Sequence, residues 1–329
     1  MLIVMQNTAT KSEIEAVCQA IQSLGFEAHK MPGAQRTAVC VTGNDGSVSE
    51  RHFAGLTGIR QIIRVSKPYK LTSNEIKTTP TVVEIGQVKF GDGQSGLIAG
   101  PACVESSKMT LTIADQLAQM GVRVFRASAF RSRTNPYNFQ GLGQQALSIL
   151  ADAKQQYGMA IVTEVTDDRQ LPQLLAVADA LIVDSHNMQH FALLKQLGKL
   201  DKPIILKRGI AATVEDFLMA AEYIMAGGNQ QVILCDAGTQ HFGDHSAHAL
   251  DITFMLALRK LTHLPIIFDP SFASGTAYMV PAMCRALMAL GADGLMVECH
   301  HDPAHTQAGG TQAILPQNLQ QVLSTFTRN

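Results

Sequence analysis

The chain has 329 residues, of which 46% are hydrophobic and 16% charged, enough apolar material for about two domains. With 26 basic against 27 acidic side chains, the net charge of -1 argues against nucleic acid and against a polybasic membrane contact. No apolar run reaches about 18 residues, and the N-terminus lacks a signal-peptide pattern. Six scattered cysteines without a CxxC pair indicate reduced core thiols of a cytoplasmic protein.

Residues 1–70 alternate between strand and helix patterns. The run LIVM predicts a strand, Ser12 is placed to cap a helix over 13–22, and Gly25 ends that helix. The strand-like run TAVCVTG, a second helical stretch and the strand-like run IRQIIRVSKPY follow. This β-α-β-β-α-β order predicts a small ferredoxin-like α+β domain.

The polar segment LTSNEIKTTPT breaks that pattern, so we expect residues 71–95 to be a linker and lead-in to a second domain over 96–329. In this second part, eight apolar runs of strand length alternate with amphipathic segments of helix length. The runs are GLIAGP, VRVFRAS, AIVTEV, ALIVDS, PIILKRG, QVILCDA, LPIIFDPS and GLMVEC, and the clearest helices span 109–120, 144–156, 214–225 and 283–290.

Eight strand–helix repeats in about 230 residues predict an α/β fold of the (β/α)8, or TIM, barrel type. A doubly wound open sheet is the alternative, and it would need a Gly-rich phosphate turn after its first strand. The sequence there, GPACVES, is not GxGxxG. We therefore expect the barrel.

In such a barrel the chemistry lies at the carboxyl ends of the strands, where this chain places many charged side chains. Burying so many charges together requires partners or a ligand. These residues are Glu105, Arg126, Glu164, Asp184, His186, Lys207, Arg208, Asp236, Asp269, Glu298 and His300.

The loop after the second strand carries Arg126, Arg131 and Arg133 within eight residues. Arginine binds phosphate or carboxylate in a bidentate way, so the sequence predicts that this loop binds an anion at the barrel mouth. The alternative is a solvated loop that only covers the barrel mouth.

Lys207 ends an apolar strand, so its ammonium should point into the barrel mouth. There it could bind an anion or, if desolvated, form a Schiff base. A salt bridge with Glu164 or Glu298 is the alternative. We expect no matched set of acids to neutralise Lys207, Arg126 and Arg133 together.

These segments resemble the type I 3-deoxy-arabino-heptulosonate-7-phosphate (DAHP) synthases, in the subgroup with an N-terminal ferredoxin-like regulatory domain. The barrel carries AGPxxVES, AFxxRTxPYxFQGLG, TEV, NMQ, PIILKRG, ILC, LPIIxDPS and GADGLMVE in family order. The resemblance covers essentially the whole chain. It implies a transferase that condenses phosphoenolpyruvate (PEP) with erythrose 4-phosphate in an aldol-type reaction at the start of the shikimate pathway of aromatic amino acid biosynthesis.

The resemblance also implies a divalent metal, but three of the four family ligands are replaced. The cysteine of the family's GPC motif aligns with Ala102, the histidine of DPSH with Phe272, and the aspartate of the last barrel loop with Gly309. Only Glu298 is kept, and one carboxylate does not hold a divalent ion. We expect no metal or other cofactor there, with Glu298 turned toward Lys207 or another cation.

A weak alternative is a replacement metal site on the loop after the sixth strand. His241 and His245 stand there at spacing i, i+4, and imidazole suits transition metals.

For substrate binding, the resemblance carries over Arg126, Arg133, Thr134, Lys207 and Asp269, and it assigns catalysis to Lys207 and Glu298. Arg131 stands for the lysine of the family's KPRT motif and still carries charge. By contrast, His186 and Ala237 replace two arginines that bind the PEP phosphate. Each charge-assisted hydrogen bond contributes about 1.5–3 kcal/mol, so we expect weaker PEP binding.

Three functions remain open at this point. The first is a synthase acting on PEP and an aldose phosphate, with Lys207 or a histidine in the role of the metal. The second is an inactive paralogue that senses a ligand or binds a partner. The third is a synthase-type enzyme with a different donor or acceptor. In each case we expect a small anionic ligand and a homo-oligomer, either a dimer or a tetramer.

Overall fold

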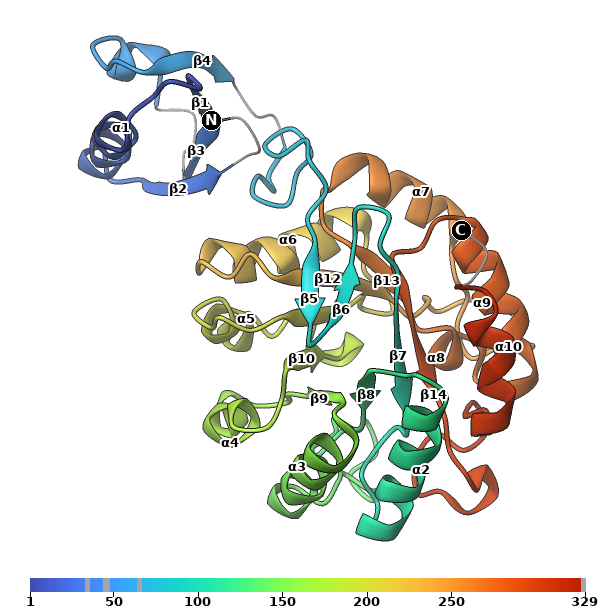
Figure 1. The fold of residues 1–329 in the computed structure, drawn as a ribbon. Helices are drawn as coiled ribbons and strands as arrows, with labels where there is room; N and C mark the ends of the chain where they lie inside the picture. The colour runs from blue at the N-terminus through green and yellow to red at the C-terminus, as the bar shows by residue number, and fades with distance from the viewer. Residues whose placement is uncertain (33–35, 44–47, 64–66, 327–329) are drawn as a thin grey trace. The chain divides into compact units, whose positions relative to one another are not determined.

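A computed structural model describes residues 1–32, 36–43, 48–63 and 67–326, and Figure 1 shows its elements. The chain divides into two compact units. The first comprises Met1–Pro80 with Ala257–His263, and the second comprises Thr81–Leu256 with Leu264–Asn329.

The first unit is an antiparallel four-stranded sheet with the order β2-β3-β1-β4. One face carries a helix whose residues Val17 and Ile21 pack on Ile3 and Val39 of the sheet. This arrangement confirms the expected ferredoxin-like fold, except that the described part of the second predicted helix is a short 3-10 turn. The elements are β1 (Leu2–Met5), α1 (Lys11–Ser23), β2 (Glu27–Pro32), β3 (Thr37–Thr42), η1 (Glu50–Phe53) and β4 (Ile59–Ile63).

The cap of α1 differs from the sequence prediction. Thr10, not Ser12, is the N-cap, because its hydroxyl accepts from the backbone N–H of Glu13 while the Glu13 carboxylate accepts from the backbone N–H of Thr10. Such a capping box satisfies two otherwise unpaired donors. Ser12 lies within the first turn. Gly25 follows the last turn with a φ of +84°, where a glycine is favoured.

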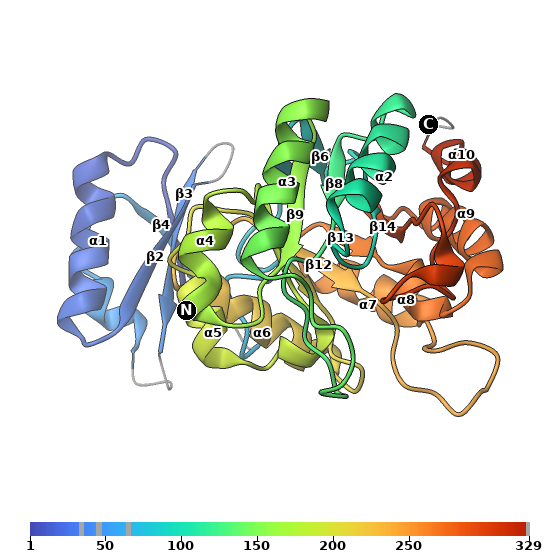
Figure 2. The same cartoon turned by 90° about the horizontal axis from the view of Figure 1, so that it is seen from below.

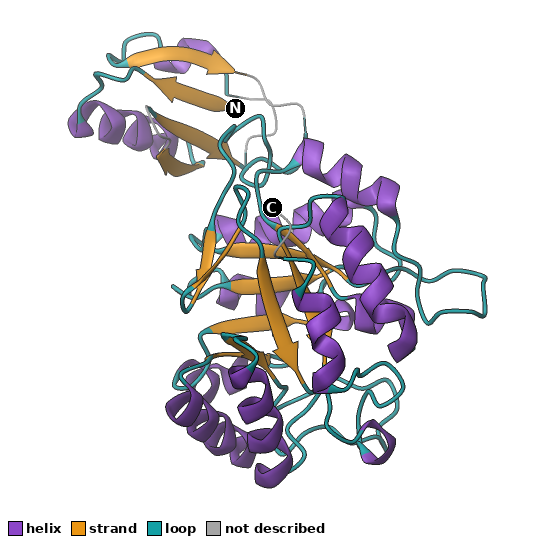
Figure 3. Cartoon of the chain, turned by 45° about the vertical axis from the view of Figure 1, so that its right-hand side comes forward, coloured by secondary structure: helices purple, strands orange, loops and turns teal. Residues whose placement is uncertain are grey.

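In the second unit eight parallel strands close into a barrel, and helices surround it (Figure 3). Each of the eight apolar runs forms one of its strands, as predicted. The strands are β7 (Gly96–Gly100), β8 (Val124–Arg126), β9 (Ala160–Glu164), β10 (Ala180–Val183), β11 (Ile204–Lys207), β12 (Val232–Asp236), β13 (Ile266–Phe268) and β14 (Gly294–Glu298). The helices are α2 (Ser107–Gln119), α3 (Gln144–Tyr157), α4 (Leu171–Leu175), α5 (Phe191–Leu197), α6 (Val214–Ala226), α7 (Ile252–Leu261), α8 (Pro270–Ser274), α9 (Val280–Ala289) and α10 (Leu319–Leu323).

A hairpin of β5 (Val83–Ile85) and β6 (Val88–Phe90) closes the amino end of the barrel. Its apolar side chains are buried with interior residues of the barrel strands. A Cβ at Gly96 would lie 2.4 Å from the ring of Phe90, and one at Gly294 would lie 2.9 Å from it. The first residues of β7 and β14 are therefore glycines because the Phe90 ring occupies the space of a side chain.

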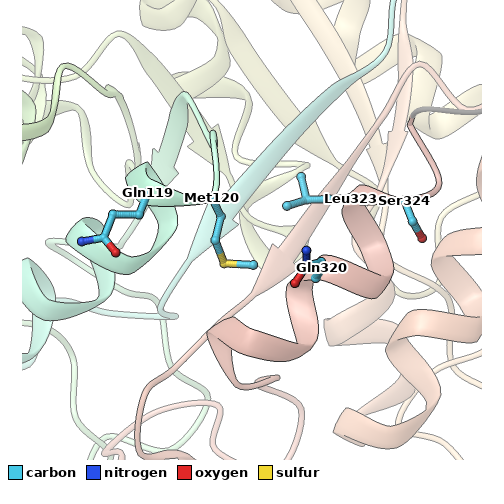
Figure 4. Close-up of a pocket in the computed structure, with 5 residues that line it drawn as sticks. All are labelled: Gln119, Met120, Gln320, Leu323 and Ser324. Carbon is cyan, nitrogen blue, oxygen red and sulfur yellow. The ribbon is translucent and has the colours of Figure 1, made fainter.

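The loops that follow β8 and β12 project on the same side of the barrel (Figure 2). Away from that mouth, a hollow of about 490 Å³ lies between the end of α2 and α10, lined by Gln119, Met120, Gln320, Leu323 and Ser324 (Figure 4). Among the described residues, no helix is both long and apolar enough to span a bilayer.

Candidate active site

The carboxyl ends of six barrel strands hold a buried group of charged side chains, which we call the inner cluster. Five members are at most 5% exposed, and the side chain of the sixth, Asp184, is 16% exposed. Charges buried this deeply require partners, so their contacts decide what the site accepts. The inner cluster comprises Arg126, Glu164, Asp184, Lys207, Asp269 and Glu298.

Lys207, at the end of β11, is held by two carboxylates. Its Nζ lies 3.2 Å from Asp184 Oδ1 and donates to Asp269 Oδ2 at 3.1 Å. The ammonium also lies 4.3 Å from the centroid of the Phe272 ring, a cation–π contact. Burial lowers the pKa of Lys207, but Asp269 and Asp184 outweigh that effect and raise the pKa above its usual value. A lysine held charged in this way is a poor Schiff-base nucleophile.

Arg126, at the end of β8, lies between Asp269 and Glu298. Its Nη1 is 3.7 Å from Asp269 Oδ2, and its Nη2 is 3.3 Å from Glu298 Oε1. Within the described part of the chain, Nε and Nη1 have no hydrogen-bond acceptor, although the side chain is buried. Buried N–H groups without an acceptor are rare, so these two donors are available to a ligand oxygen.

The expectation concerned Lys207, Arg126 and Arg133 together, and the structure divides them: Lys207 and Arg126 are paired with acids, whereas Arg133 forms no ion pair within the described residues. The segments after β10 and β13 bring Asp184 and Asp269 to the same ammonium, and Glu298 pairs with Arg126. Glu298 thus turns to a cation, as expected, but the cation is Arg126. Three carboxylates face two cations in this group.

Glu164, at the end of β9, is a fourth inner carboxyl. Burial, followed by the charge of Asp184, raises its pKa to about 7 against the opposing effect of Arg131. Its Oε1 accepts from the backbone N–H of Ser132 at 3.0 Å, and its Oε2 accepts from the Ser128 hydroxyl at 3.4 Å. A carboxyl that titrates near neutral pH is suited to accept and return a proton.

Asp184 joins the inner cluster to His186. The Asp184 Oδ2 lies 3.2 Å from His186 Nδ1, and this hydrogen bond raises the pKa of His186. Burial would raise the pKa of Asp184, but Lys207, His186 and Arg131 together hold it below its usual range. Asp184 therefore stays ionised and bridges the Lys207 ammonium and the His186 ring.

Two further cations lie on the loop after β8, and we call Arg131 and Arg133 the outer arginines. Arg131 Nη1 lies 4.0 Å from the Cys103 sulfur, and Arg133 Nε donates to the Phe139 carbonyl at 3.0 Å. Neither arginine forms an ion pair within the described ranges. Burial lowers the pKa of Arg133, and the charge of Arg131 lowers it further. Burial lowers the pKa of Arg131, but Cys103 and the nearby acids Glu298, Glu164 and Asp184 together raise it above its usual value. The two like charges thus lie close together without an ion-paired acid, and Thr134 is exposed on the same loop.

The residues at the family's metal positions do converge in space, but they do not fit a metal. A Cβ at Gly309 would lie 2.5 Å from Glu298 Oε2 and 3.1 Å from the Ala102 Cβ. Only Glu298 offers a ligand atom there, and Arg126 and the Gln312 amide, at 2.6 Å, occupy its two oxygens. A divalent ion needs several oxygen, nitrogen or sulfur donors. The only available metal donor is thus one carboxylate whose oxygens already have other partners.

Phe272, at the fourth family position, is part of an aromatic stack. Its ring lies 4.7 Å from that of His248 with 13° between the planes. His241 and His245, the alternative metal pair, lie edge to face at 5.3 Å, and His241 Nε2 contacts Ser246. In the residues that the structure describes, no group of three or more His, Cys, Asp or Glu side chains is arranged to hold a metal.

The sequence suggested Glu164 as a possible partner of Lys207 and noted Asp184 only as a charged strand end, whereas the structure pairs Lys207 with Asp184 and Asp269 and gives both Glu164 and Asp184 a central place. Their signal was present, since each is an acid at the end of an apolar run. Gln312 carried no such signal, because it belongs to a loop without a pattern.

The comparisons with known proteins cover both units. A model of the DAHP synthetase I family matches residues 69–328, and a model of the DAHP synthase ferredoxin-like domain matches residues 1–67. The chain is 38% identical over 314 residues to a phospho-2-dehydro-3-deoxyheptonate aldolase of Thermotoga maritima, covering 95% of this chain and 93% of that one.

Its structure is similar to the crystal structure of the Thermotoga maritima DAHP synthase. The TM-score is 0.77 at 36% identity, with 98% of this chain and 95% of the other covered. A 2-dehydro-3-deoxyphosphooctonate aldolase of Francisella tularensis is 26% identical over 261 residues, which cover 74% of this chain and 94% of that protein.

Proposed function

We propose, from the premise that this chain belongs to the DAHP synthetase I family, that it forms a carbon–carbon bond between a three-carbon donor and an aldose phosphate without a divalent metal. In the parent reaction, water adds to C2 of PEP while C3 attacks the aldehyde carbon, and inorganic phosphate leaves. The relatives' names describe such 3-deoxy-2-oxo sugar acid phosphates.

The single observation that carries the proposal is that neither outer arginine forms a direct ion pair with an acid within the described residues. Guanidinium groups bind phosphate by charge-assisted, bidentate hydrogen bonds. Arg131 and Arg133 would hold the phosphate of the aldose, with the exposed Thr134 hydroxyl beside them. The aldehyde would then point from the loop toward the inner cluster.

In the inner cluster, two groups are suited to the chemistry. The unpaired Nε and Nη1 of Arg126 would donate to the aldehyde oxygen and stabilise the charge that develops on it. Glu164 would take up and return the proton, because burial and Asp184 keep its pKa close to neutral. Lys207 and Glu298 would position Asp269 and Arg126.

The test is product formation in the presence of a chelator. The protein is incubated with an aldose phosphate of three to five carbons and with PEP or pyruvate, and a 3-deoxy-2-oxo acid is sought by mass spectrometry. Product from the wild type that is lost in R133A supports the proposal. No product from any pair contradicts it.

A second candidate is a ligand-binding protein without turnover. Pairing of Lys207 and Arg126 with carboxylates favours it, because a PEP phosphate would have to displace those partners. Aldose phosphate binding without product would identify this role. For either function we propose a cytoplasmic homo-oligomer, and the six free, buried cysteines support a reducing compartment.

A further inference from the structure

We propose that the carboxylate of Asp184 occupies the place of a ligand phosphate, so that the donor taken by the inner cluster carries no phosphate of its own. This inference rests on the proposed function and names the donor class, a 2-oxo acid with a single carboxylate. The inference is based on the charged groups that surround Lys207.

Asp184 makes the contacts that a bound anion would make. One oxygen lies 3.2 Å from Lys207 Nζ, and the other lies 3.2 Å from His186 Nδ1. The family resemblance implies substrate binding for Lys207 and a phosphate-ligand position for His186. The third position, Ala237, is a buried methyl group and offers no charge.

The remaining charges oppose a phosphate dianion at this point. Lys207 also binds Asp269, and Arg126 binds Asp269 and Glu298, so neither cation is free of a carboxylate. Glu164 faces the negative charge of Asp184 as well. A phosphate dianion placed here would meet three carboxylates against only two cations in a poorly screened interior.

The unpaired groups instead suit a smaller, singly charged donor. One of the two unpaired N–H groups of Arg126 can donate to the 2-oxo oxygen of such a donor, which leaves the other for the aldehyde oxygen. For a 2-oxo acid, Glu164 would remove a proton from C3, and the resulting enolate carbon would attack the aldehyde carbon. The alkoxide oxygen would then take a proton from the Glu164 carboxyl, which gives a 4-hydroxy-2-oxo acid and consumes no other reactant.

The first test measures binding of PEP, pyruvate and inorganic phosphate by calorimetry. D184N keeps the shape of the side chain but removes the charge. D179N is the matched control, since Asp179 also pairs with a lysine, Lys154, at 2.8 Å. We expect PEP to bind D184N at least about tenfold more tightly than the wild type or D179N, because one like charge is gone. The gain should disappear in D184N/K207M.

Equal PEP affinity of folded D184N and the wild type, or a gain that survives K207M, overturns the inference. Melting curves establish that each variant is folded. If D184N does not fold, D184G and D184S carry the same test.

The second test follows exchange of the pyruvate methyl protons in D2O by NMR. The wild type should catalyse exchange and E164Q should not, while no exchange by the wild type overturns the assignment of the donor. Neither test measures formation of the carbon–carbon bond. Failure to find any product would therefore count against the proposed function, and the binding result for D184N would stand separately.

Discussion

Lys207 and Arg126 in the inner cluster each lie beside two carboxylates, whereas the outer arginines have no carboxylate partner in the described part of the chain. Both groups face the carboxyl ends of the strands, and sequence alone assigned them to one basic site. The difference shows that positive charge and capacity for an anion are separate properties. A cation that is already paired contributes little to anion binding, because its partner must first be displaced.

The largest expected effect concerns the parent reaction, which requires the inner cluster to accept PEP. We expect DAHP formation from PEP and erythrose 4-phosphate to be at least about a thousandfold slower than in the Thermotoga maritima relative, with or without added Mn²⁺. The missing metal and the lost phosphate contacts each remove several kcal/mol of stabilisation, and each 1.36 kcal/mol is tenfold in rate. PEP consumption is measured for both proteins side by side.

Restoring the lost groups sharpens this prediction. A102C, F272H, G309D and A237R together, combined with D184N, should raise the Mn²⁺-dependent rate, and the same five changes should raise Mn²⁺ affinity in calorimetry. A wild-type rate comparable with that of the relative would show that the inner cluster accepts PEP as it stands.

The next effect lies in the outer arginines. R131A and R133A should each weaken erythrose 4-phosphate binding about tenfold or more, since a charge-assisted hydrogen bond is worth about 1.5–3 kcal/mol. Titration calorimetry gives the affinities. Arg123 is an exposed arginine just before β8, at the opposite end of the barrel, so R123A serves as the charge-matched control. An equal loss in R123A would mean that the effect is general electrostatics.

Glu164 provides a test of burial in the inner cluster. Its pKa is raised from 4.5 to about 7, so the folded chain binds this proton more tightly than the unfolded chain. The free energy of unfolding of the wild type should therefore fall, relative to that of E164Q, as the pH rises from 4.5 through 7. The expected difference is about 3 kcal/mol, from 1.36 kcal/mol per pKa unit. Denaturant melts at pH 4.5 and 8 measure it.

E215Q, at an exposed glutamate of α6, provides the control for that experiment. If the difference in the free energy of unfolding between E164Q and the wild type does not change with pH, Glu164 is ionised in the folded protein throughout this pH range.

The smallest effect is on His186. Its pKa is raised mainly by the hydrogen bond to Asp184, so D184N should lower the pKa of His186 toward its usual value. NMR titration of the ring protons reads this shift directly. An unchanged pKa of His186 in D184N would mean that His186 and Asp184 are not hydrogen-bonded in solution.

The fold could be predicted because its signal is local and repeated. Eight apolar runs at regular spacing predict a closed barrel without any knowledge of which side chains contact one another. The ferredoxin-like order was predicted as well, but its details depended on single side chains. Thr10 and Ser12 are equally good caps by residue type, and only the geometry of the Glu13 side chain decides between them.

The site was harder to predict because pairing is a property of three dimensions. Residue type assigns Lys207 and Arg126 a charge, but not the distances to Asp184, Asp269 and Glu298. Those acids come from strands whose ends meet only when the barrel closes. The outer arginines were easier to identify, since both lie on one loop within three residues of each other.

The hairpin formed by β5 and β6 has a practical consequence for dissecting this protein. Because the Phe90 ring fills the space above Gly96 and Gly294, the barrel strands do not complete their own interior. A shortened chain that began at the first barrel strand would lack the Phe90 ring and expose an apolar cavity in its place. We expect such a chain to aggregate or to bind another hydrophobic segment. A workable boundary for the isolated barrel therefore falls before Leu71, ahead of the hairpin and of the carbonyls of Leu71 and Thr72 that contact His263 and Thr262.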